Sequence, residues 1–300
     1  MVRSSTASQQ KASLPMSERL TLDPAYDDLE DHDRGLVFDL VTLDRRRMLQ
    51  LLGFGGVTAT MFTIAACGPG GSTGAAGTAT ATPSAADGAA SCAIIPQETA
   101  GPYPGDGSNG PNVLAESGVV RRDIRSSFGS STKVAEGIPL TIQLTIQDGA
   151  DCAPLAGAAV YLWHCDRDGN YSLYSEPVAA ENYLRGVQAA DDNGLVEFSS
   201  IFPACYAGRW PHIHFEVYPS LELATNESNK IATSQVALPK DACDAVYATD
   251  GYGESVAKLA QLSLTSDNVF GEDGGVQQLG TVSGDPSSGY TVVLTVPVNA

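Results

Sequence analysis

The chain has 300 residues and a formal net charge of −18, from 17 basic and 35 acidic side chains. So acidic a protein is repelled by nucleic acid and by anionic lipid headgroups, which argues against binding either through a basic surface. Apolar residues make up 43% of the chain, which suits a folded core, while 31 Gly and 17 Pro divide it into short runs. Composition therefore favours a loop-rich β protein with little helix.

Residues 1–67 are predicted to be an N-terminal extension followed by an export signal. Arg45, Arg46 and Arg47 precede Met48, Leu49 and an apolar stretch that ends in small residues and Cys67, an order typical of secretory signals. The arginine pair resembles a twin-arginine signal, and the residues up to Cys67 resemble a lipobox. We expect an extracytoplasmic protein whose only membrane contact is a lipid at Cys67. A retained transmembrane anchor is the alternative, disfavoured because glycine and threonine interrupt the apolar stretch.

Residues 68–90 consist almost entirely of Gly, Ala, Ser, Thr and Pro, and are predicted to be a flexible linker. The folded unit is expected over residues 91–300. After export its cysteines can form disulfides, but five is an odd number, so at least one thiol stays free. The pairing is open, with Cys205–Cys243 the preferred pair among Cys92, Cys152, Cys165, Cys205 and Cys243.

Short apolar or alternating runs between turn residues predict β-strands in the folded unit. The predicted strands cover residues 140–146, 158–164, 195–198, 213–218, 234–238 and 290–296. A single helical segment is expected over residues 244–263. Short strands with glycine-rich turns predict two packed antiparallel sheets, which is an all-β sandwich with long loops.

Two of the four histidines, His212 and His214, are two positions apart in a predicted strand. Their side chains therefore point to the same face of the sheet, where they either bind a metal or form a polar face. Tyr206 lies six residues before His212, and Tyr171 follows the turn residues Asp168 and Gly169. A phenolate is a hard, anionic ligand, so a metal beside this set would be Fe(III) rather than zinc or copper(I).

Three segments together resemble the intradiol ring-cleavage dioxygenases, the family of the catechol and protocatechuate dioxygenases. They read IPQETAGPYP (95–104), PLAGAAVYLWHCDRDGNYSLYS (154–175) and NYLRGVQAADDNGLVEFSSIFPACYAGRWPHIHFEVY (182–218). The resemblance implies that a catechol-type diol and O2 are the substrates and that the ring is cleaved between its two hydroxyl-bearing carbons to a cis,cis-muconate. It also implies one non-haem Fe(III) per chain, with Tyr171, Tyr206, His212 and His214 as ligands.

The resemblance further implies roles for residues around the metal. Arg209 is expected to stabilise negative charge on the bound substrate, and Tyr206 to accept one of its protons. Tyr103, Trp163 and Gln235 are expected to line the substrate pocket together with Arg209.

Two other classes of protein remain as alternatives. The first is a secreted, transthyretin-like binding module that carries no metal and catalyses nothing. The second is a zinc hydrolase that uses His212 and His214, although no obvious third ligand accompanies them.

Overall fold

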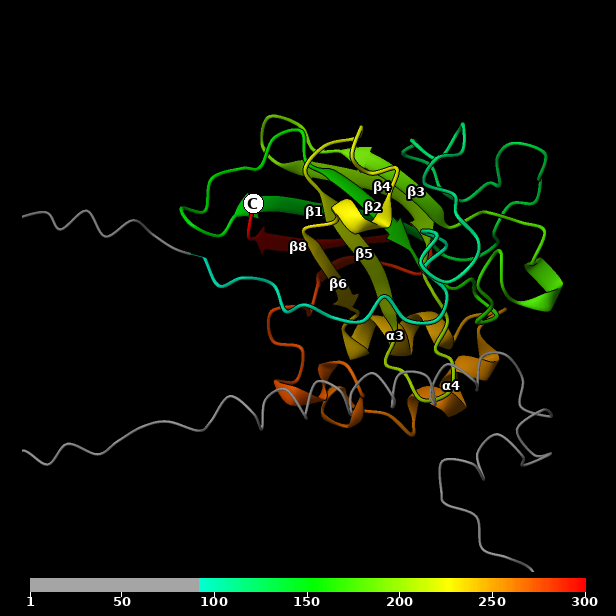
Figure 1. The fold of residues 1–300 in the computed structure, drawn as a ribbon. Coiled ribbons are helices and arrows are strands. Elements are labelled where there is room, and N and C mark those ends of the chain that lie inside the picture. The colour runs from blue at the N-terminus through cyan, green and yellow to red at the C-terminus, as the bar shows by residue number, and fades with distance from the viewer. Residues whose placement is uncertain (1–91) are drawn as a thin grey trace, which may run out of the picture.

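The computed structural model describes residues 92–300, which fold into two four-stranded β-sheets (Figure 1). The first sheet has the order β4 (Leu195–Ile201), β1 (Pro139–Asp148), β8 (Gly289–Val298) and β7 (Thr281–Asp285). The second has the order β3 (Arg185–Ala189), β2 (Ala159–Trp163), β5 (His212–Tyr218) and β6 (Ala232–Ala237). The predicted signal and linker lie outside the described residues.

The alternation of apolar side chains in β1 and β5 creates the core between the sheets. Leu140, Ile142 and Leu144 of β1 are fully buried, with polar residues between them, because successive side chains point to opposite faces of a strand. Ile213 and Phe215 of β5 belong to the same apolar core. The predicted β-sandwich is therefore confirmed.

All neighbouring strands pair antiparallel except β1 and β8, which run parallel with Leu140 opposite Tyr290. A parallel pair needs a long crossover connection. Here the chain between Asp148 and Gly289 supplies it and contains the whole second sheet. The six predicted strands are present.

Two strands and a helix break were missed by the sequence prediction. Strand β3 reads RGVQA and strand β7 reads TVSGD, and neither carries the apolar alternation that marks a strand. The predicted helical segment is two helices, α3 (Lys240–Tyr247) and α4 (Gly253–Leu259), at one end of the sheets (Figure 1). Four short 3-10 helices occur in the loops, namely η2 (Glu176–Val178), η3 (Glu227–Asn229), η4 (Leu264–Ser266) and η5 (Phe270–Glu272).

No helix within residues 92–300 is long and apolar enough to cross a membrane.

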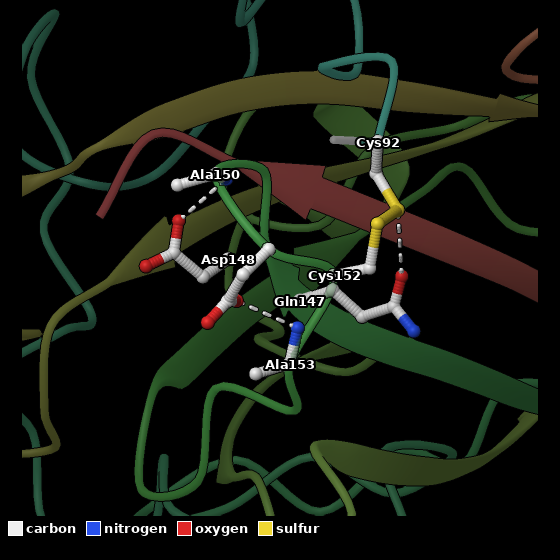
Figure 2. Close-up of a disulfide and its surroundings, with 7 residues drawn as sticks. Cys92, Gln147, Asp148, Ala150, Cys152 and Ala153 are labelled. Carbon is white, nitrogen blue, oxygen red and sulfur yellow. Dashed lines mark hydrogen bonds between the residues drawn. A yellow bond between two sulfur atoms is a disulfide. The ribbon is translucent and has the colours of Figure 1, made fainter. Parts of the chain in front are cut away.

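One disulfide joins Cys92 to Cys152, with their Cα atoms 5.5 Å apart (Figure 2). The preferred pairing of Cys205 with Cys243 is wrong, because both are buried free thiols, as is Cys165. The Cys243 thiol lies 3.9 Å from the carbonyl oxygen of Leu238 within its own segment. A disulfide needs two Cβ atoms directed at each other, and spacing along the chain does not reveal that direction.

The disulfide fixes the start of a segment without regular secondary structure, residues 92–105, which we call the strap (cyan in Figure 1). The N–H of Ile95 donates to the carbonyl of Pro297 in β8 at 2.9 Å. Three residues later the N–H of Glu98 donates to the carbonyl of Thr233 in β6 at 2.8 Å. The strap therefore passes from the first sheet to the second and ends over the outer face of the second.

His164 links the end of β2 to the first sheet. Its Nδ1 lies 2.7 Å from the carbonyl oxygen of Cys165, and its Nε2 lies 2.7 Å from the Oγ of Ser200 in β4. Burial, assisted by the charge of Arg185, lowers the pKa of His164 from 6.5 to about 4, although the carbonyl of Cys165 opposes the shift.

This shift makes stability depend on pH. The unfolded chain binds a proton at His164 below pH 6.5, and the folded protein does so only below about pH 4. The free energy of unfolding should therefore fall by about 3 kcal/mol as the pH drops through this window. We expect His164→Gln to be less stable at pH 7 and to lose this part of the pH dependence, measured by urea unfolding at pH 7, 5.5 and 4.5. If the free energy of unfolding changed equally with pH in the wild type and in His164→Gln, His164 would not be the source of this pH dependence.

Candidate metal centre

Strand β5 places both histidines on the outer face of the second sheet. His212 and His214 point away from the core that Ile213 and Phe215 enter, as the two-residue period of a strand requires. Both imidazoles are buried, and their Nε2 atoms lie 3.0 Å apart. The strand therefore holds two potential ligand nitrogens side by side.

Both predicted tyrosines reach the histidine pair from loops. The Oη of Tyr206 lies 3.1 Å from the Nε2 of His212, and the Oη of Tyr171 lies 3.4 Å from that of Tyr206. The four side chains, Tyr171, Tyr206, His212 and His214, are called the ligand cluster below. The structure thus brings all four predicted side chains together. The two tyrosines alone are 35 residues apart in the sequence.

A tight turn sets the position of Tyr171. The carboxylate of Asp166 accepts hydrogen bonds from the N–H groups of Asp168 at 3.0 Å and Asn170 at 2.8 Å. Gly169 has φ +91°, which a residue with a Cβ adopts only at a cost. The Asp-Arg-Asp-Gly sequence therefore encodes the reversal that turns Tyr171 back towards the sheet.

The hydrogen bond of His212 fixes which of its nitrogens faces the cluster. Its Nδ1 lies 2.5 Å from the carbonyl oxygen of Trp210, and a carbonyl only accepts, so Nδ1 carries the proton. The Nε2 lone pair of His212 therefore points at the other three groups, the arrangement of a metal-binding histidine.

His214 is held by packing. Its ring stacks on Trp163 at 4.9 Å with 5° between the planes, and its buried Nδ1 has no hydrogen-bond partner among the described residues. A Cβ at Gly101 of the strap would lie 3.3 Å from its Cε1. The imidazole is thus confined between the sheet and the strap.

Burial favours the uncharged forms of both imidazoles and of the Tyr171 phenol. Desolvation, assisted by the charge of Arg209, lowers the pKa of His212 to about 3, and desolvation lowers that of His214 well below its usual value. Burial, assisted by the neighbouring Tyr206, raises the pKa of Tyr171 well above 10. Two neutral imidazoles beside two phenol oxygens, of which that of Tyr171 ionises only next to a strong positive charge, fit a hard, highly charged cation.

Arg209 is a buried cation beside the cluster. Its guanidinium donates to Asp267 at 3.1 Å and to the Oε1 of Gln235 at 2.7 Å. Gln235 lies opposite His214 in the sheet and donates its amide N–H to the carbonyl of Thr99 in the strap at 3.0 Å. The two predicted polar pocket residues therefore contact each other next to a histidine of the cluster.

Asp267 was missed by the sequence reasoning. Burial raises its pKa, but Arg209 and the backbone N–H groups of Trp210 and Phe270 outweigh burial and bring the pKa below its usual value. It lies 58 residues from Arg209 in a polar loop. Nothing in that local sequence distinguishes this buried aspartate from the aspartates that lie on the surface.

The two predicted aromatic pocket residues occupy different positions. Tyr103, in the strap and half-buried, has its ring 4.9 Å from that of Tyr171. Trp163 is completely buried behind His214. Tyr103 can therefore face a ligand at the cluster, whereas Trp163 supports the imidazole.

The zinc-hydrolase alternative requires a third nitrogen, sulfur or carboxylate ligand. Within residues 92–300, no group of three or more His, Cys, Asp or Glu side chains could hold a metal ion. The cluster depends on its tyrosines instead.

Comparisons with known proteins identify relatives of this chain. Residues 109–217, which include the whole ligand cluster and Arg209, match the sequence profile of a family described as "Dioxygenase". Chlorocatechol 1,2-dioxygenase of Rhodococcus opacus is 40% identical over 53 residues, 18% of this chain and 21% of that protein. The match therefore spans about a fifth of the curated relative's length.

Two solved structures resemble the fold. The intradiol ring-cleavage dioxygenase from Tetranychus urticae has a TM-score of 0.55 and 24% identity, over 69% of this chain and 95% of that one. A second dioxygenase has a TM-score of 0.55 and 23% identity over the same shares of the two chains, 69% and 95%. At this level of identity the likeness establishes the fold.

The ion pair of Arg209 with Asp267 can be tested by stability. Asp267→Asn leaves a buried guanidinium without its counter-charge, so we expect a loss of about 3–5 kcal/mol in the free energy of unfolding. Asp244→Asn is the control, because it breaks a pair with Lys240 whose side chains are both exposed, and it should cost less than about 1 kcal/mol. Equal losses in denaturant unfolding would contradict a structural role for the buried pair.

Proposed function

Because the chain belongs to the intradiol ring-cleavage dioxygenase family, we propose that it cleaves a catechol-type ring between its two hydroxyl-bearing carbons. Both atoms of one O2 enter the product, so a catechol and O2 give a cis,cis-muconate with no other reactant. The observation that carries the proposal is the ligand cluster, in which two phenol oxygens and two imidazole nitrogens follow one another at 3.4, 3.1 and 3.0 Å.

We propose that Tyr171, Tyr206, His212 and His214 hold one non-haem Fe(III). Two phenolates offset two of its three positive charges, and the imidazoles are neutral because burial lowers their pKa values. Bound Fe(III) supplies a Lewis acid that makes the diol reactive towards O2. Fe(III) prefers hard, anionic oxygen ligands of this type.

The residues of the chain bind the substrate and move its protons. Tyr206 is half-buried whereas Tyr171 is buried, so Tyr206 is the ligand that an incoming diol can reach. Its phenolate oxygen accepts a proton from one substrate hydroxyl. Arg209 cannot move away from this place, since Asp267 and Gln235 hold it, and it stabilises the negative charge of the bound catecholate. Tyr103 covers Tyr171 from the strap side.

The alternative of a binding module without catalysis gives no reason for this arrangement. Burying polar groups costs free energy unless they are paired or serve a ligand. Here His212 and His214 present their Nε2 atoms to each other at 3.0 Å, a contact in which at most one hydrogen bond can form. A cation between these nitrogens and the phenols gives each group a partner.

Visible absorption spectroscopy and metal analysis of the full chain test the proposal. We expect one iron per chain, a burgundy colour from tyrosinate-to-iron charge transfer, and a shift of the band to lower energy when catechol is added without O2. Tyr206→Phe should weaken or move the band. Tyr247→Phe is the matched control, because this buried tyrosine donates to the carbonyl of Pro203 at 3.0 Å and is outside the cluster.

A protein that stays colourless and takes up no iron would overturn the proposed function. A band that is identical in the wild type and in Tyr206→Phe would overturn the assignment of that ligand.

We also propose that the protein is exported by a twin-arginine route and attached to a membrane by lipid at Cys67. The disulfide between Cys92 and Cys152 supports an oxidising destination, since disulfides are rare in the cytosol. Replacing both Arg45 and Arg46 by Lys should retain the protein in the cytoplasm, and Cys67→Ala should release it from the membrane fraction. Arg34→Lys, outside the run of arginines, is the matched control and should leave export and membrane attachment unchanged, as judged by cell fractionation.

A further inference from the structure

Arg185, the first residue of β3, is an arginine buried beneath the strap, with 1% of its surface exposed. Its guanidinium makes five hydrogen bonds, which use all five of its N–H donors. The acceptors are the carbonyl oxygens of Tyr103, Pro104 and Ser172, the Oγ of Ser172 and the Oη of Tyr161, at 2.7–3.1 Å.

Within residues 92–300, no carboxylate accepts a hydrogen bond from this guanidinium. Arg209, by contrast, has Asp267. Burying a charge is costly unless it is fully hydrogen-bonded. Here backbone carbonyls accept three of the five hydrogen bonds. The arginine therefore ties main chain to main chain rather than neutralising a charge.

The carbonyls belong to the two segments that bring side chains to the ligand cluster. Ser172 directly follows Tyr171, and Tyr103 lies in the strap with its ring 4.9 Å from that of Tyr171. The strap also presses Gly101 against His214. One side chain thus links the main chains of two segments, which also contact each other where the N–H of Gly105 donates to the Oη of Tyr174 at 2.8 Å.

The backbone around Arg185 adopts positive φ at several positions. Leu173, next to Ser172, has φ +74°, and Leu184, next to Arg185, has φ +55°, values that a leucine adopts only under constraint. In the strap, Gly105 has φ +66°, and a Cβ there would lie 2.8 Å from an Arg185 nitrogen. The strap can approach the guanidinium so closely only because this residue is glycine.

We propose that Arg185 is a positioning residue for the ring-cleavage site, acting through the main chain of Ser172 and of the strap to hold Tyr171 and Tyr103 in place. The proposal rests on the function proposed above. A lysine cannot substitute, because its single ammonium nitrogen cannot reach both segments with the geometry of a planar five-donor fork.

Amide hydrogen exchange on the metal-free protein tests the positioning directly. In Arg185→Met and Arg185→Lys, we expect the amides of Gly105, Tyr171 and Ser175 to exchange at least about tenfold faster than in the wild type, while amides of β1 and β8 keep their rates. The matched control is Tyr252→Phe, which loses buried hydrogen bonds to the backbone of Ile138 and Phe202. Tyr252→Phe should leave the exchange rates of those three amides unchanged.

Iron binding gives the second measurement. We expect the affinity for Fe(III) to fall by about 10- to 100-fold in Arg185→Lys, as for other residues that orient metal ligands, with a shifted tyrosinate-to-iron band. Tyr252→Phe should keep both the affinity and the band.

The outcomes separate the two proposals. Unchanged exchange at Gly105, Tyr171 and Ser175 in Arg185→Lys would overturn the positioning role, even where Arg185→Met does not fold. An unaltered Fe(III) affinity and band in Arg185→Lys would do the same. A wild-type protein that binds no Fe(III) would overturn the proposed function, and the exchange rates of the metal-free protein would still decide whether Arg185 fixes the two segments.

Discussion

The burial of β5 on both faces is the constraint on which the site depends. One face of the strand completes the core with Ile213 and Phe215, while the other carries His212 and His214. The neighbouring strands set the surroundings of His214, since Trp163 of β2 and Gln235 of β6 lie opposite it. A shift of one residue in this register would send the imidazoles into the apolar core. The core packing and the candidate metal centre therefore depend on the same strand pairing.

Two buried arginines beside the ligand cluster are held in different ways. Arg209 is paired with Asp267, so its charge stays in place beside the cluster with its stem and guanidinium enclosed. Arg185 donates its hydrogen bonds to main-chain and hydroxyl oxygens, so it connects loops and is not paired with an opposite charge. Both arrangements reflect the same physical rule, that a buried cation must have all its donors satisfied. They differ in whether the partner is a carboxylate or the backbone.

The strap connects the stability of the sandwich to the site. It begins at the disulfide with Cys152 (Figure 2), crosses β8 and β6, and ends over the ligand cluster. It contains no strand or helix of its own, so its path is fixed by single hydrogen bonds and by glycines that permit close contact. A segment of this kind is positioned almost entirely by the surfaces it crosses.

The sequence by itself predicted the β-sandwich and, through its resemblance to a known family, the four side chains that the structure brings together. Alternation in β1 and the His-x-His spacing act over a few residues, and the period of a strand converts them directly into a core face and a ligand face. Only the tertiary structure decided the Cys92–Cys152 pairing, the parallel β1–β8 pair and the partners of the buried arginines. Asp267 is 58 residues from Arg209, and Arg185 is more than 80 from its strap acceptors. Such contacts depend on how loops fold across the finished sheets, and no local pattern of residues encodes that path.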